Sequence, residues 1–124
     1  MRLSHIGVLA GLVFSLTSAA SAHHAFNMYD NGKYVNIKGT VKEYHWTNPH
    51  VYLFVLARAP DGKMEEWSIE CSSLNIIGRK GWTPNSLKAG DAVDVTTHPM
   101  KDGSKVGLMV SVKTPDGHVL KDKT

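Results

Sequence analysis

Cysteine is almost absent from this sequence, since Cys71 is the only one in 124 residues. A single cysteine cannot form a disulfide within the chain, so the fold must be held together by its apolar core. After loss of the leader described below, about 100 residues are left, which is just enough to build such a core without cross-links. We therefore expect Cys71 to be buried as a small apolar side chain.

Catalytic signatures are missing as well. The sequence has no Gly-x-Ser-x-Gly, no phosphate-binding Walker loop and no His-Glu-x-x-His. A few carboxylates are expected on any strand-rich surface, and the strands predicted here carry Glu43, Glu65, Glu66 and Glu70. We therefore place an enzyme behind two other functional classes, a binding module and a copper-binding protein. We predict that the protein is not an enzyme.

No block of one charge sign occurs. The chain has 14 Lys and Arg against 11 Asp and Glu, a formal net charge of +3, and the two signs are interspersed. A mild and scattered excess of positive charge is typical of a solvated surface. We therefore predict no nucleic-acid partner.

The apolar run at residues 6–16 is too short to span a bilayer. It lies between Arg2 and the small-x-small motif Ala20-Ser21-Ala22, which is the pattern of a secretory signal peptide. We predict removal of residues 1–22, with cleavage after Ala20 as the alternative. No later segment is long and apolar enough for a membrane helix, and no cysteine closely follows the run for lipid attachment. The mature protein is expected to be a soluble monomer in the periplasm or secreted, without membrane insertion.

Alternating apolar and polar residues predict short strands after a polar, turn-rich arm at residues 23–33. The expected strands cover residues 34–42, 50–58, 64–71, 92–98, 106–114 and 118–120. Gly39 within the first strand indicates a bulge or a tight bend. The second strand is apolar on both faces, which predicts cover on both sides. The predicted core comprises Val35, Ile37, Val41, Leu53, Val55, Ile69, Val93, Val95, Leu108 and Val110.

The periodicity changes after the third strand. Ser72 or Ser73 is expected to cap a short helix at residues 74–79, which Gly81 ends, and Pro84 indicates one further helical turn. Three strands, a short helix and then two strands predict an all-β fold, a small OB-like five-stranded barrel over residues 34–121. Another small barrel or an open sandwich is the alternative.

A stiff corner is predicted between the first two strands, because Asn48-Pro49 is a turn signal that a strand interior does not tolerate. Proline fixes its own φ and restricts the residue before it, which suits a binding surface. The candidate ligand-binding residues are those of the corner and two that lie further along the chain: Trp46, Asn48, His50, Glu70 and Trp82. The alternative is structural, with the corner held by side-chain hydrogen bonds and the tryptophans packed in the core or at its rim.

Histidine is over-used, with seven in the chain and six after residue 22. Cleavage after Ala22 would make His23 the N-terminal residue, whose amine and imidazole chelate Cu(II), with His24 to assist. Cleavage after Ala20 would instead place His23 third, which also gives a copper or nickel site. His50 and His98 are the candidates to complete a metal site, whereas the alternative treats His23 and His24 as incidental residues of the arm.

Several short segments recur together in one protein family. They are His23-His24-Ala25-Phe26, Gly39-Thr40-Val41, Trp46-Thr47-Asn48-Pro49-His50, Trp67-Ser68-Ile69-Glu70, Gly81-Trp82, Ser86-Leu87-Lys88-Ala89-Gly90-Asp91 and Asp102-Gly103-Ser104. On these residues the mature chain resembles the exported bacterial proteins grouped as domain of unknown function 6152. The resemblance implies a small exported bacterial protein, but it does not indicate any particular activity. Cys71 stands where glycine is expected, and this difference affects no candidate binding residue.

These observations favour a periplasmic β-barrel binding module that needs no cofactor and whose partner, a small molecule or a protein, contacts the corner at residues 46–50. The alternative is a periplasmic copper-binding protein that uses His23 and His24. Titration of the processed protein with Cu(II), Zn(II) and Ni(II) separates the two.

Overall fold

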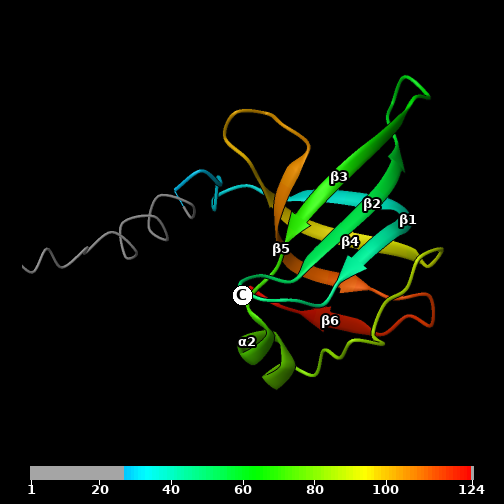
Figure 1. The fold of residues 1–124 in the computed structure, drawn as a ribbon. Coiled ribbons are helices and arrows are strands. Elements are labelled where there is room, and N and C mark those ends of the chain that lie inside the picture. The colour runs from blue at the N-terminus through cyan, green and yellow to red at the C-terminus, as the bar shows by residue number, and fades with distance from the viewer. Residues whose placement is uncertain (1–26, 124) are drawn as a thin grey trace, which may run out of the picture.

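A computed structural model describes residues 27–123, and the predicted leader with His23 and His24 lies outside them. The described part consists of strands and a short helix (Figure 1), namely β1 (Val35–His45), β2 (Tyr52–Arg58), β3 (Met64–Glu70), α2 (Leu74–Arg79), β4 (Ala92–Pro99), β5 (Val106–Lys113) and β6 (Val119–Lys121). This order matches the one predicted from the sequence. The turn predicted to be helical at residues 83–87 is instead a hydrogen-bonded turn, in which the Ser86 N–H donates to the Thr83 carbonyl at 3.1 Å.

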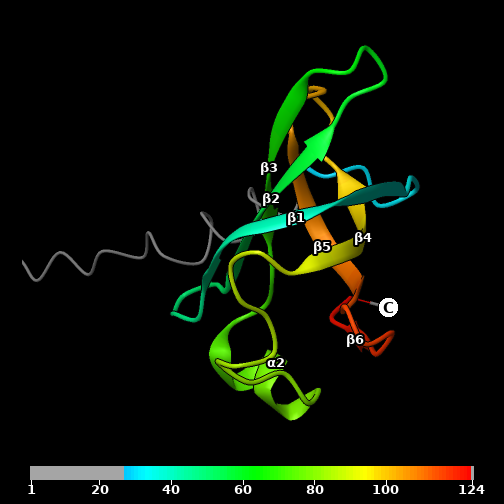
Figure 2. The same cartoon turned by 90° about the vertical axis from the view of Figure 1, so that its right-hand side faces the viewer.

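The sheet closes into a barrel. Its strand order is β3-β2-β1-β4-β5-β6, and β3 also pairs in parallel with β5, which joins the two ends of the five-stranded part. All other strand pairs are antiparallel. Figure 2 shows the β2–β3 hairpin at one end of the barrel and α2 at the other. This is the OB-like five-stranded barrel with a helix between strands 3 and 4, so the predicted fold class is confirmed.

Gly39 is required for close approach of two strands. A Cβ atom at this position would lie 2.2 Å from the Leu56 carbonyl oxygen of β2, a distance that no side chain tolerates. The β-bulge itself lies three residues later, where the pairing of β1 with β2 shifts between Val41 and Glu43. The glycine thus allows the bend, and the extra residue of the bulge is Lys42.

The core lies inside the barrel and is formed by inward-facing residues of β1 to β5. The prediction that Leu108 and Val110 share one inward face of β5 is wrong, because the pairing of β5 with β4 is irregular opposite Thr96 and Thr97 and leaves Val110 unpaired. Met109 before this bulge and Val112 after it both face the core, although an odd number of positions separates them. Val110 is only half-buried, and Leu108 is buried outside the main core cluster.

The second face of β2 is also less covered than predicted. Leu53 and Val55 are fully buried, whereas Tyr52, Phe54 and Leu56 on the opposite face are half-exposed. An apolar strand face that remains in contact with water is a feature of binding surfaces.

The described part of the arm is fixed to the barrel. Tyr29 forms a β-bridge with Met100, and the Asp30 N–H donates to the Pro99 carbonyl at 2.8 Å. The Tyr29 side chain is buried at 4% exposure. In the part of the chain from residue 27 to 123, no helix is long and apolar enough to cross a bilayer.

Candidate functional site

The corner between β1 and β2 is where the sequence placed the ligand site. Its Asn48–Pro49 peptide bond is cis. The Asn48 side-chain oxygen accepts a hydrogen bond at 3.1 Å from the backbone N–H of Leu74, the first residue of α2. Ser73 occupies the N-cap position but forms no side-chain cap bond. Asn48 therefore caps the helix from a distant loop, which is the structural alternative for this residue.

Trp46 lies in the same corner, directly after β1. Its half-buried ring packs against the core, with the Tyr44 ring centroid 6.1 Å away. The Tyr44 hydroxyl donates to the Thr83 carbonyl at 2.9 Å. Trp46 thus packs with Tyr44 against the core, which is the structural alternative for this residue.

Trp82 is a core residue. It is 2% exposed, and its indole N–H donates to the Lys121 carbonyl at 2.9 Å. Neither the ring nor its N–H is available to a ligand at the surface. The structure thus separates Trp82 from the other predicted ligand-binding residues and gives it the packing role of the structural alternative.

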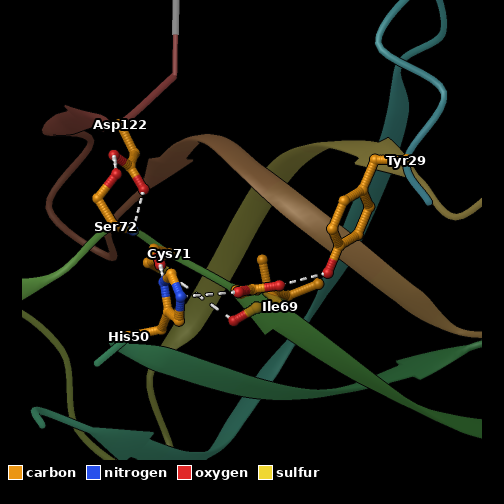
Figure 3. Close-up of polar contacts among 7 residues, drawn as sticks. Tyr29, His50, Ile69, Cys71, Ser72 and Asp122 are labelled. Carbon is orange, nitrogen blue, oxygen red and sulfur yellow. Dashed lines mark hydrogen bonds and ion pairs between the residues drawn. The ribbon is translucent and has the colours of Figure 1, made fainter. Parts of the chain in front are cut away.

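His50 and Glu70 are the two predicted site residues that the fold brings together. The His50 Nδ1 lies 3.1 Å from the Cys71 carbonyl oxygen, which only accepts hydrogen bonds, so Nδ1 carries a proton and donates. The Nε2 atom then lies 3.4 Å from the Glu70 Oε1 (Figure 3). The His50 side chain is 32% exposed and the Glu70 side chain 13%. A fixed imidazole and a carboxylate therefore meet at a position that solvent reaches.

Tyr29 completes this group from the arm. Its hydroxyl donates to the Glu70 Oε2 at 2.6 Å, a short bond to a carboxylate (Figure 3). Glu70 thus has one oxygen held by the arm and one that faces His50. We call Tyr29, His50 and Glu70 the His50–Glu70 cluster.

A buried carboxylate holds the chain segment behind this cluster. Asp122, which is 0% exposed, accepts the Ser72 backbone N–H at 2.7 Å and the Ser72 hydroxyl at 2.6 Å (Figure 3). Lys80 donates to the Asp122 backbone carbonyl and lies 3.8 Å from its side-chain oxygen. Because Ser72 directly follows Cys71, this contact fixes the carbonyl that orients His50.

Aromatic side chains adjoin the cluster on the outer face of β1 and β2. Tyr52 is paired with Glu70 across the strands, and its ring is stacked on that of Phe54 at 6.2 Å. The His45 ring meets Phe54 edge to face at 5.0 Å. We call His45, Tyr52 and Phe54 the aromatic stripe. It offers an apolar surface next to the carboxylate of Glu70.

Of the predicted metal ligands, the structure describes His50 and His98. The His98 Nδ1 donates a hydrogen bond at 2.8 Å to the Lys33 carbonyl oxygen, because a carbonyl oxygen can only accept. The His98 ring centroid lies 4.7 Å from that of Tyr34. Among residues 27–123, no three His, Cys, Asp or Glu side chains converge as a metal site requires. His50 and Glu70 supply two candidate ligands, and His23 and His24 lie outside the described residues.

Comparison with known proteins identifies the family. A family model described as a family of unknown function, DUF6152, matches residues 10–111. The chain belongs to the DUF6152 family. No curated protein matches it in sequence. Among solved structures it is similar to the mitochondrial single-stranded DNA-binding protein of S. cerevisiae, with 15% identity over 73% of this chain and 96% of that one and a TM-score of 0.48.

In this DUF6152 chain, the residues that sequence reasoning missed are Tyr29, Tyr52 and Phe54. Tyr29 lies in the polar arm, and its partner Glu70 is 41 residues away. The sequence did contain a signal for Tyr52 and Phe54: the second face of β2 is apolar, and such a face can remain exposed as a binding surface. The closed barrel leaves that face outside.

Alkaline pH is expected to destabilise this DUF6152 protein through Tyr29. Burial, and then the hydrogen bond to Glu70, raise the pKa of Tyr29 well above its usual value of 10.0. A raised pKa in the folded state favours the neutral phenol, so this contribution is full below pH 10 and is lost as the pH rises further. Urea unfolding between pH 8 and 11.5 should show the loss, at up to about 1.4 kcal/mol per pH unit. Tyr29→Phe should reduce the slope above pH 10, and an unchanged slope would contradict this assignment.

Proposed function

We propose that the protein is an exported binding module that holds its ligand at the His50–Glu70 cluster. One observation supports the proposal most: the His50 Nε2 and the Glu70 Oε1 face each other at 3.4 Å, with the imidazole fixed from behind by the Cys71 carbonyl. This distance exceeds that of a good hydrogen bond, so both atoms retain capacity for a third group. The signal-peptide pattern of residues 1–22 supports export.

The surroundings of the cluster favour a ligand with a positive or N–H-bearing group. Glu43 is an exposed carboxylate that pairs across the strands with Phe54, so it lies on the same outer face as the aromatic stripe. A cation at Glu70 would also contact the aromatic stripe, whose ring faces attract positive charge. The favoured ligand is therefore a small amine or guanidine, or the same group on a Lys or Arg side chain of a protein partner.

The same charges argue against nucleic acid. Proteins that bind single strands track the phosphates with positive charge along an aromatic-lined groove. Here the aromatic stripe lies beside Glu43 and Glu70, and Lys42 is paired with Glu66 at 2.9 Å. The outer face of the OB-like barrel, which is its usual ligand surface, thus carries the wrong sign of charge for a phosphate chain.

Binding of amines to the cluster is expected to depend on the charge of Glu70. Agmatine, benzylamine and spermidine are the probes, screened by thermal shift and then titrated by calorimetry. Glu70→Gln keeps the shape and removes the charge, so the affinity for the bound amine should fall at least about tenfold. Glu66→Gln is the matched control on the same strand and should change it less than about twofold.

Two results would contradict the proposed amine site. One is that no probe binds the wild-type protein. The other is that Glu70→Gln binds a probe as tightly as the wild type does. Circular dichroism of each variant verifies that the barrel remains folded.

Copper binding is the second candidate function, and the orientation of His50 favours it. Metal-ligating histidines commonly donate their second ring N–H to a carbonyl or carboxylate, as His50 Nδ1 does to Cys71. Its free Nε2 lies beside a carboxylate oxygen. Tyr29 is bound to that carboxylate, and His23 and His24 precede Tyr29 by six and five residues. An extended segment of that length spans up to about 20 Å, which is long enough for the two histidines to approach Glu70.

Cu(II) titration of protein that begins at His23 tests this second candidate. Deletion of His23 and His24 should abolish high-affinity binding, because the chelate formed by the N-terminal amine and imidazole is lost. His50→Ala should weaken the site at least about tenfold, and His118→Ala in the β5–β6 turn should not. Unchanged copper affinity after the deletion would exclude the site.

A further inference from the structure

A pocket of about 440 Å³ opens at the other end of the barrel from the His50–Glu70 cluster. β1 pairs with β4 from Val35 to Thr40, but it pairs with β2 only from Gly39 onward. Beyond this point the two strands diverge, and β2 continues with β3 into the extended hairpin that Figure 2 shows. The pocket lies where they part and is lined by Asn36, Ile37, Lys38, Ala57, Arg58, Ala59, Pro60, Glu65, Trp67 and Lys105.

The floor of this pocket is apolar. Ile37, Ala57 and Trp67 are buried residues of the core cluster that line it from below. The Trp67 indole N–H donates to the Glu65 Oε2 at 3.3 Å, so the ring is fixed in orientation. A flat aromatic or aliphatic group that entered the pocket would displace water from these surfaces.

The rim of the pocket is mainly positive. Lys38, Arg58 and Lys105 line it, and Glu65 is the one carboxylate among the lining residues, which leaves a net charge of +2. Lys105 Nζ lies 5.2 Å from the centre of the Trp67 ring and 3.5 Å from Glu65. The Lys38 side chain is 79% exposed, and its Nζ lies 4.0 Å from the Asp94 Oδ2.

Arg58 is placed to receive an anion. Its Nη1 donates to the Gly62 carbonyl at 2.8 Å, which holds the guanidinium over the hairpin end of the pocket. A guanidinium carries five N–H donors in a planar fork that matches a carboxylate or sulfonate. Arg58 and Lys105 thus place positive charge beside an aromatic floor.

We infer that this pocket is a second binding site, for a small organic anion with an aromatic or apolar body. The body would lie on Trp67, Ala57 and Ile37, and the acid group would contact Arg58 and Lys105. The volume lies within the range of small-molecule sites, of about 300 to 1,000 Å³. The pocket shares no residue with the His50–Glu70 cluster and has the opposite charge, so the two sites would select different ligands.

Naphthalene-2-sulfonate is the probe that tests this site, titrated by calorimetry and by two-dimensional NMR. It should bind and shift the indole N–H signal of Trp67, and the uncharged naphthalene-2-methanol should bind more weakly. Arg58→Gln and Lys105→Gln should each lower the affinity at least about fivefold, because each removes one charge from the rim. Arg79→Gln, at the exposed end of α2, is the matched control and should leave the affinity unchanged.

The inference is overturned by any of three results. These are no binding of the sulfonate at millimolar concentration, affinities of Arg58→Gln and Lys105→Gln equal to that of the wild type, or an equal loss in Arg79→Gln. Glu70→Gln should bind the sulfonate normally. Failure of the amine site and failure of this pocket are thus distinguishable.

Discussion

Replacement of Asp122 by alanine is expected to lower the free energy of unfolding by about 3 to 5 kcal/mol. The carboxylate is fully buried and accepts two hydrogen bonds from Ser72, and Lys80 lies beside it. Its removal leaves a buried N–H and a buried hydroxyl without partners, at about 1 to 3 kcal/mol each, and takes away the partner of a cation. Urea unfolding monitored by tryptophan fluorescence measures the loss.

Two controls separate this effect from general loss of charge. Asp61→Ala removes an exposed carboxylate that bonds only the Lys63 N–H in the β2–β3 turn, and should cost less than about 1 kcal/mol. Ser72→Ala combined with Asp122→Ala should cost less than the sum of the single variants, because both changes remove the same side-chain hydrogen bond. A loss below 1 kcal/mol for Asp122→Ala would show that the chain end does not hold the segment at residues 70–73.

Truncation of Leu53 to alanine is the second change with a large expected effect, of about 2 to 5 kcal/mol. Leu53 is fully buried near the start of β2 and packs in the core between β1 and β3. Its loss removes apolar contacts and leaves a cavity that a closed barrel cannot easily collapse. Unfolding in urea at neutral pH measures the difference.

Lys42→Ala is the control for the core prediction. Lys42 is exposed and forms one surface ion pair with Glu66, so its loss should cost less than about 1 kcal/mol. Equal and small losses for Leu53→Ala and Lys42→Ala would contradict the assignment of the inner face of the barrel.

The strand order could be predicted because each strand carries an alternating pattern and each turn has its own residues. Val41, Leu53, Ile69 and Val95 face inward as that pattern requires. The exchange of faces in β5 could not be predicted, because a bulge at Val110 inserts one residue without any change in composition. The same limit applies to β1, where the sequence marks Gly39 and the bulge lies at Lys42.

The candidate site was predicted only in part, and the reason is separation along the chain. His50 and Glu70 were both selected, and the pairing of β2 with β3 brings them together. Asn48 has the residue type of a ligand-binding side chain, yet its oxygen caps a helix 26 residues away. Asp122 lies past the last predicted strand, and nothing in its local sequence indicates that it contacts Ser72.

The two ends of the barrel differ in a way that composition does not show. The corner end has Glu70 beside an aromatic stripe, whereas the hairpin end has Arg58 and Lys105 beside Trp67. The chain as a whole has only a mild positive charge. The fold therefore sorts interspersed charges into two surfaces of opposite sign.

We propose that the ligand of this domain contacts the His50–Glu70 cluster. Its most direct test is a ¹H–¹⁵N NMR spectrum of the histidine rings during titration with the amine that binds best. We expect the ring signals of His50 to shift first and most and those of His45, His98 and His118 to shift less, and we expect Glu70→Gln to suppress the change. A ligand that binds while the His50 ring signals stay in place would contradict it.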